Sequence, residues 1–119
     1  MRIPMVFVGL LVAGCVPVLV AQDAAKVDSA HYKVISENSQ VRILRVHYGP
    51  HEKSAMMHSH PDSVVVFLSA GKTEFHYPGG KTEIMEGKPG DARFTPRTVH
   101  LPENLSDQPM DAIVIELKK

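Results

Sequence analysis

The sequence predicts an all-β domain over residues 31–119. Short runs rich in β-branched and aromatic residues follow one another, and turn-forming Gly and Pro residues separate them. The two most apolar runs lack the period of an amphipathic helix. A chain with many short strands and Gly/Pro turns folds as a sandwich or a barrel.

Several runs have strand character, and they cover residues 41–48, 63–68, 73–77, 81–85 and 112–117. The first run stops at Gly49-Pro50, which is typical of a strand end. Pro78-Gly79-Gly80 separates the third run from the fourth, and a short Gly-containing link of this kind joins antiparallel strands into a hairpin. Residues 87–91 contain another Gly/Pro turn, so the chain shows no domain boundary after residue 30.

Residues 1–21 have the composition of an export signal. Arg2 stands near the start, an apolar run follows, and the run ends at Ala21 before polar Gln22. A transmembrane anchor is the alternative, but two glycines and Pro17 interrupt a run that is already short for a span of ~20 apolar residues. We therefore expect export to the periplasm or the medium.

A second cleavage site lies inside the same segment. Val12-Ala13-Gly14-Cys15 resembles the lipobox of bacterial lipoproteins, in which the signal is cut before a cysteine that is then lipidated. The chain stays apolar beyond Cys15, whereas a lipoprotein usually turns polar there. We expect cleavage after Ala21 and a soluble product, with a lipid-anchored protein as the alternative.

Composition excludes several classes of function. Cys15 is the only cysteine, so a chain without residues 1–21 has no disulfide and no thiolate chemistry. Loss of that segment removes Arg2 and no acid, which leaves twelve basic and thirteen acidic side chains interspersed along the chain. This balance is not typical of proteins that bind nucleic acids or anionic membranes.

Residues 22–30 are rich in Ala and Asp and have no apolar period, so we expect a tether ahead of a barrel over residues 31–119. A domain of this size buries only ~60% of its unfolded surface, and pairing with a second copy hides more. We therefore expect a homodimer.

Three histidines are the candidate metal ligands. In an extended strand His58 and His60 point to the same side, and His100 can reach the same point from a strand folded back alongside. A lone His-x-His is more often two half-exposed side chains. The later run from Gly90 to Pro96, followed by His100, makes a ligand set the better interpretation.

These residues resemble the two motifs of the cupin superfamily over residues 41–117. The first motif is G-x5-H-x-H-x3–4-E-x6-G, and the second is G-x5-P-x-G-x2-H-x3-N. The resemblance implies a double-stranded β-helix, or jelly-roll barrel, with a metal or ligand inside its mouth. It also implies that His58, His60 and His100 are the metal-binding histidines and that Gly71 closes the first motif.

The chain departs from the motifs at several places. Counting back from Gly71 puts Val64 at the position of the metal-binding glutamate, so the carboxylate ligand is missing. By strand alternation we expect Val64 to face the barrel interior together with Val66 and Leu68. Thr98 stands where the second motif has glycine, and His100 comes one residue early.

Three imidazoles with open coordination positions suit a divalent transition metal, Fe, Zn, Cu or Ni, better than Mg or Ca, because borderline metals favour nitrogen ligands. Open positions admit water, dioxygen or a chelating substrate. A three-His site without the glutamate resembles the thiol-dioxygenase branch of the cupins, which implies a metal-dependent dioxygenase or a related enzyme. The catalytic residues are unknown.

A binding or sensing module is the alternative function. The barrel would then capture a small molecule without turnover, and a barrel without metal would use the histidines only for hydrogen bonds. A general acid or base facing the cavity separates an enzyme from such a module. The sequence identifies no such group.

Other polar and sulfur-containing residues are weaker candidates. We expect Met56 to share the face of His58 and His60 and to pack in the core. Asp62 is a possible replacement carboxylate, although its place at a strand end favours solvent. We expect surface positions for the remaining polar candidates, which are Glu103, Asn104, His31, His47 and His76.

Overall fold

The computed structural model describes residues 22–119. The predicted export signal, residues 1–21 with Cys15, lies outside the described residues. Within the described residues, one short helix and nine strands follow in order: α1 (Ala24–Val27), β1 (Tyr32–Glu37), β2 (Val41–Tyr48), β3 (His58–His60), β4 (Ser63–Phe67), β5 (Gly71–His76), β6 (Thr82–Gly87), β7 (Ala92–Thr95), β8 (Thr98–Asn104) and β9 (Met110–Leu117). Within residues 22–119, no helix is long and apolar enough to cross a membrane.

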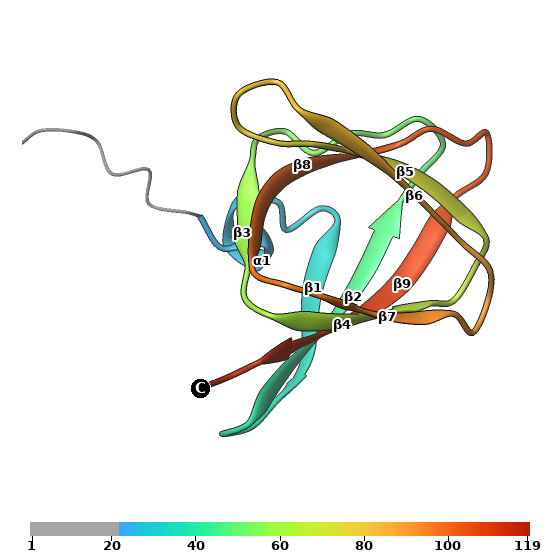
Figure 1. The fold of residues 1–119 in the computed structure, drawn as a ribbon. Helices are drawn as coiled ribbons and strands as arrows, with labels where there is room; N and C mark the ends of the chain where they lie inside the picture. The colour runs from blue at the N-terminus through green and yellow to red at the C-terminus, as the bar shows by residue number, and fades with distance from the viewer. Residues whose placement is uncertain (1–21) are drawn as a thin grey trace, which may run out of the picture.

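The strands form two antiparallel sheets that face each other as the walls of a barrel (Figure 1). The larger sheet has the order β1-β2-β9-β4-β7, and the smaller sheet has the order β3-β8-β5-β6. Strands distant in the sequence are therefore neighbours, as in a jelly roll. The predicted all-β fold is confirmed.

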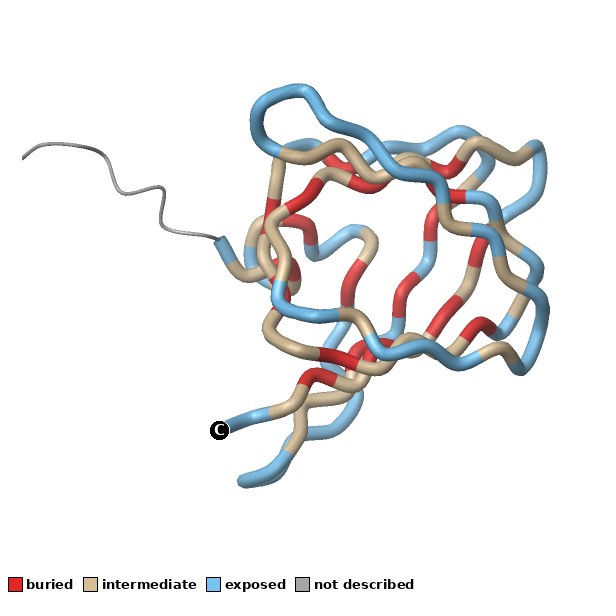
Figure 2. Tube along the Cα trace, in the orientation of Figure 1, coloured by how far each residue is buried: buried red, intermediate tan, exposed pale blue. Residues whose placement is uncertain are grey.

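Strand alternation builds the interior of the larger sheet. Every second residue of β9 from Met110 to Glu116 is buried, and the second half of β2 alternates in the same way (Figure 2). The two strands pair in register, Leu44 opposite Val114 and Val46 opposite Ala112, so their buried side chains share one face. This face is the main hydrophobic core.

The predicted hairpin is confirmed between β5 and β6. Gly79 and Gly80 in its turn have φ values of 90° and 93°, a region that residues with a Cβ rarely adopt. The hairpin extends the smaller sheet beyond β8 and supplies aromatic side chains to the interior.

Residues 22–28 pack against the barrel beside β3. Asp23 caps α1 by accepting a hydrogen bond from the Ala25 backbone N–H, and Ala24 is fully buried. The Ser59 backbone N–H donates to the Gln22 carbonyl at 2.7 Å. The segment expected to be a tether therefore holds the strand that carries His58 and His60.

Candidate metal centre

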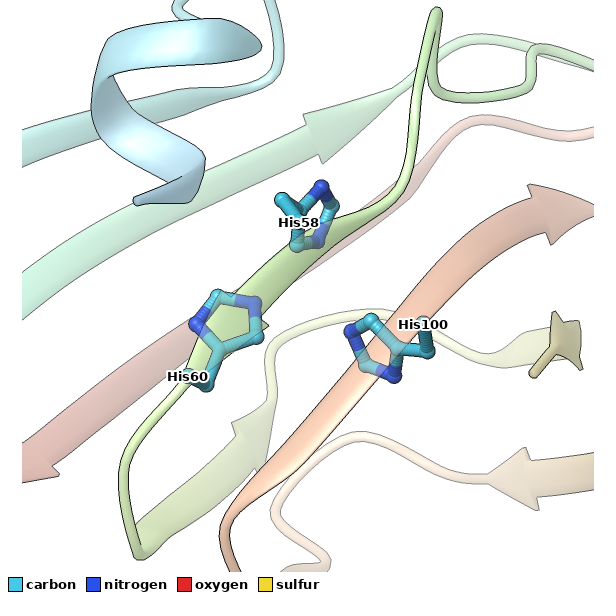
Figure 3. A group of neighbouring side chains, drawn as sticks. All are labelled: His58, His60 and His100. Atoms are coloured by element: carbon cyan, nitrogen blue, oxygen red, sulfur yellow. The ribbon is translucent and has the colours of Figure 1, made fainter. Parts of the chain in front are cut away.

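Two neighbouring strands bring the three predicted histidines together. His58 and His60 are alternate residues of β3 and point to the same side of it. β3 pairs with β8 so that His58 lies directly opposite His100. Histidines at least forty positions apart in the sequence thus lie close together, as Figure 3 shows.

The three imidazoles form a compact, buried cluster. His58, His60 and His100 have 0%, 7% and 8% of their surface exposed. Their ring centroids are 4.9 to 5.3 Å apart, and one nitrogen from each ring lies within 4.8 Å of the others. This separation suits a single ion bound to three nitrogens.

The donor atoms fit a metal because several have no other partner. Both ring nitrogens of His58 and Nε2 of His100 are buried without a hydrogen-bond partner among residues 22–119. Buried polar groups are normally hydrogen-bonded, since desolvation without a partner costs free energy. Unpaired imidazole nitrogens that converge on one point are the arrangement expected around a divalent ion.

Burial favours the neutral form of His58 and of His100. Burial, with a smaller electrostatic contribution from His60, lowers the pKa of His58 to about 3. The same two causes lower the pKa of His100 to about 2. A neutral imidazole has a free lone pair, which is the form that binds metals.

His60 is also held from behind by a carboxylate on β9. Its Nδ1 lies 2.8 Å from Oε2 of Glu116, which is 3% exposed. Arg42 donates from Nε to the other oxygen of Glu116 at 2.9 Å and makes two further contacts to Asp23, at 2.6 and 3.0 Å. A chain of charged side chains therefore connects the histidine cluster to the N-terminal segment.

Two hydrogen-bonded tyrosines also pack beside the cluster. The Tyr48 hydroxyl donates to that of Tyr32 at 2.9 Å and lies 2.6 Å from the Ser54 hydroxyl. The Tyr32 ring meets the His58 ring edge-on, with centroids 4.8 Å apart. Burial raises the pKa of both Tyr32 and Tyr48, so these rings stay neutral and fix the shape of the site.

The cluster opens into a cavity of about 320 Å³ within the barrel. His60 and His100 line it, whereas His58 does not. The wall is mostly apolar, with side chains from both sheets: Val46, Val65, Phe67, Phe75, Met85, Met110 and Val114. A cavity of this size and character fits a small molecule with a substantial hydrocarbon part.

Aromatic residues from β5 and the turn after it shape the wall next to His100. The Phe75 ring stacks on the His100 ring with centroids 4.7 Å apart and an interplanar angle of 2°. The Tyr77 hydroxyl donates to Glu83 at 2.7 Å, and both side chains line the cavity. Desolvation raises the pKa of Tyr77 to about 12, so it remains a hydrogen-bond donor at neutral pH.

The expected orientation of Val64 is wrong. Ser63, Val65 and Phe67 line the cavity, so the residues between them face the outside of the larger sheet. Val64 pairs with Phe94, which is 60% exposed. The first motif tolerates four residues between histidine and glutamate, and this spacing puts Val65 at the glutamate position.

Two other expectations also need correction. Met56 is 45% exposed in a bend before β3 and does not line the cavity. Asn104 is fully buried, and its amide donates to the carbonyls of Gly49 and Gln108 at 3.0 and 2.9 Å. Asp62 lies outside the cavity and accepts from the Arg97 backbone N–H.

The remaining histidines have local partners. His31 stacks on Tyr48 with centroids 4.1 Å apart, and His47 contacts Asp111 on the outer face of the larger sheet. His76 lies 3.0 Å from Glu103 and 3.6 Å from Glu74. The side chains of His76, Glu74 and Glu103 are all partly exposed. They lie on β5 and β8, away from the cavity.

Sequence reasoning missed Glu116, Phe75 and Tyr77. Glu116 sits in an apolar closing strand, and an acid at an inward position of such a strand is a signal that a buried partner exists. The aromatic residues alternate along residues 73–77 in the way expected for one face of a strand. Only the strand register shows that this face meets His100.

Solved structures share this fold. A cupin domain from Bordetella pertussis Tohama I matches with a TM-score of 0.67 and 24% identity, covering 74% of this chain and 92% of that one. A double-stranded β-helix protein from Klebsiella pneumoniae matches with a TM-score of 0.57 and 22% identity, covering 72% and 74%. These likenesses show the fold alone.

A cupin-fold protein from Methanocaldococcus jannaschii has a TM-score of 0.56 and 12% identity, covering 72% of this chain and 77% of its own. A comparison with curated proteins gives no match. The model of the Cupin domain family matches residues 44–116, which include every strand from β3 to β8 and all three histidines. The chain therefore belongs to the Cupin domain family.

Proposed function

We propose that this protein binds one divalent transition metal through His58, His60 and His100 and presents it to a small, largely apolar molecule in the barrel. The observation that supports the metal is the set of buried ring nitrogens without hydrogen-bond partners on His58 and His100. The nitrogen ligands favour Fe, Zn, Cu or Ni. A bound ion of this kind polarises a coordinated group or activates dioxygen.

The protein's own residues would bind, orient and shield the reacting molecule. The apolar wall on both sheets excludes water, which strengthens electrostatic interactions in the cavity. The stacked ring of Phe75 fixes the plane of His100, and the Tyr77 hydroxyl can donate a hydrogen bond to a ligand in place of Glu83. In this proposal the protein is a metal-dependent enzyme, and a dioxygenase is the reaction class we favour.

Metal content tests the proposal directly. Protein purified without chelators should carry about one transition metal per chain by elemental analysis, because three ligands define one site. His58→Ala should lose the metal, and His51→Ala, which alters an exposed histidine, is the matched control. Wild-type protein that takes up none of Fe(II), Zn(II), Cu(II) or Ni(II) would overturn the proposal.

Binding without turnover is the second candidate function. It is favoured by Val65, which gives the cavity a hydrocarbon surface where the family motif has a carboxylate. Small molecules released from the purified protein by denaturation, and identified by mass spectrometry, separate the two candidates. A ligand that survives incubation with the metal-loaded protein and dioxygen favours binding, whereas its conversion favours an enzyme.

We further propose that the protein is exported and acts as a homodimer. Export is supported by the sequence of residues 1–21, and pairing is supported by apolar side chains on the outside of the larger sheet. Ile43, Ile115, Val64 and Phe94 stand in one row across four neighbouring strands.

A further inference from the structure

Two carboxylates on β9 each contact one histidine and one arginine. Glu116 faces the interior and contacts His60 and Arg42 at 2.8 and 2.7 Å. Asp111 faces outward and contacts His47 and Arg45, both at 2.9 Å. The groups are alike in chemistry and differ in burial, because the Glu116 side chain is 4% exposed and the Asp111 side chain 25%.

The contacts of Glu116 define which ring nitrogen of His60 carries hydrogen. An ionised carboxylate can only accept hydrogen bonds, and Glu116 forms an ion pair with Arg42. Oε1 accepts from Arg42, so Oε2 accepts from Nδ1 of His60. With hydrogen on Nδ1, the Nε2 lone pair of His60 is free for a metal.

Glu116 reaches this position from the strand next to β4. In the register of the larger sheet Glu116 lies opposite Ser63, whose side chain lines the same interior as Val65. The carboxylate that the family motif places on β4 is therefore absent, but another carboxylate enters the site from β9. It contacts the back of a histidine rather than the point where three imidazoles converge.

The carboxylate is itself fixed in place. Its strand partner Arg42 lies directly opposite in the sheet and also holds Asp23, the residue that caps α1. The hydrogen bond and the electrostatic attraction of Arg42 lower the pKa of Asp23. Because Asp23 holds Arg42 in place, Arg42 in turn holds the Glu116 carboxylate. The carboxylate therefore has little freedom to turn toward the point where the three imidazoles converge.

We propose that Glu116 is a positioning residue that fixes the orientation and the tautomer of His60 and thereby keeps Nε2 available to the metal. This inference rests on the proposed metal site. Outer carboxylates that hold metal-binding histidines typically contribute 10–100-fold to metal affinity.

Glu116→Gln tests the role with little change in shape. The donors of Arg42 should attract the amide oxygen, which turns the amide NH2 toward His60. Nδ1 must then accept a hydrogen bond, so hydrogen moves to Nε2 and blocks the metal-binding lone pair. We expect a 10–100-fold loss of Zn(II) and Co(II) affinity in chelator competition.

Asp111→Asn is the matched control, because it makes the same type of change in the outward carboxylate of β9. Glu116→Asp is the conservative variant. It keeps the charge, so it should retain hydrogen on Nδ1 and recover part of the affinity, whereas a purely structural role would make the two Glu116 variants alike. Circular dichroism and melting curves identify any variant that fails to fold.

The tautomer can be read without metal. Nitrogen-15 NMR of the metal-free protein should show hydrogen on Nδ1 of His60 in the wild type, in Glu116→Asp and in Asp111→Asn, and on Nε2 in Glu116→Gln. Unchanged nitrogen shifts and unchanged Zn(II) affinity in Glu116→Gln would overturn the proposal. Failure of the wild type to bind any metal, with the tautomer shift still present, would instead refute the metal site.

Discussion

Val64 and Val65 are neighbours on β4, yet they face opposite sides of the larger sheet. Val65 lines the cavity and pairs with Val114 of the core, whereas Val64 lies in the outer row between Ile115 and Phe94. The pair therefore offers one inward and one outward position of identical chemistry on the same strand.

We predict that Val65→Glu adds a carboxylate to the cavity and tightens Mn(II) or Fe(II) binding relative to the wild type, because oxygen ligands suit these ions. Without metal the carboxylate would be desolvated in an apolar wall, and its cross-strand neighbour Arg93 is partly exposed, so the melting temperature should fall. Metal titration and thermal unfolding with and without metal check both expectations.

Val64→Glu is the control for that experiment. Its carboxylate would lie on the outer face of the sheet, away from the cavity, so metal preference should stay that of the wild type. Tighter metal binding by Val64→Glu than by Val65→Glu would contradict the orientation of β4.

The stability of the metal-free protein should depend on pH through His58 and His100. Their pKa values of about 3 and about 2 in the folded protein lie below the ordinary value of 6.5, so the unfolded chain binds protons first as the pH falls. The contribution of the two histidines to the free energy of unfolding should be greatest above pH ~6.5 and should decrease as the pH falls toward ~3. Each histidine contributes about 1.4 kcal/mol per pH unit within this window.

Urea unfolding of chelator-treated protein at several pH values measures this slope. His100→Asn removes one of the groups that bind a proton on unfolding, so the free energy of unfolding should change less steeply with pH. His51→Asn, at an exposed position, serves as the control. Equal slopes in the wild type and His100→Asn would show that His100 takes up protons in the folded protein.

The proposed homodimer should depend on the outer apolar row. Phe94 is 60% exposed in this row, so Phe94→Asp would place a charge in the interface and should give a monomer by light scattering after size exclusion. Ile84→Asp is the control, because Ile84 is 45% exposed on the other sheet. A wild type that remains monomeric at ~100 µM would contradict the expectation, since a stable homodimer forms well below this concentration.

The proposed export has two distinguishable products. We predict a soluble protein that starts near Gln22, with the chain cut after Ala21. Mass spectrometry of the exported protein decides the site, and a diacylglyceryl group on an N-terminal Cys15 would refute cleavage at Ala21. The Cys15→Ser variant, which cannot be lipidated, should leave the predicted product unchanged.

The sequence predicted best those features that depend on local pattern. β2 covers the predicted residues 41–48, and the hairpin at Gly79 and Gly80 lies where its turn chemistry indicated. His58 and His60 share a face because both lie in one uninterrupted strand. The approach of His100 to the same point was predicted from the second motif rather than from alternation, and its register opposite His58 is a finding of the structure.

The errors arose where the alternation is interrupted. His60 and Ser63 both face the interior although three positions separate them, because the turn at Pro61 and Asp62 restarts the alternation. The count back from Gly71 put Val64 at the inward glutamate position, one residue away from Val65, which lines the cavity. Glu116 was missed for another reason, since its contact with His60 depends on the pairing of β4 with β9, which no local pattern encodes.

His58 has no exposed surface and takes no part in the wall of the cavity, whereas His60 and His100 do. A ligand therefore approaches the three imidazoles from the cavity side, opposite His58. The stacked rings of Phe75 and His100 form one wall of this cavity, so a flat prochiral molecule packed against that wall would offer one face to the imidazoles. If the protein transforms such a molecule, its product should be a single enantiomer.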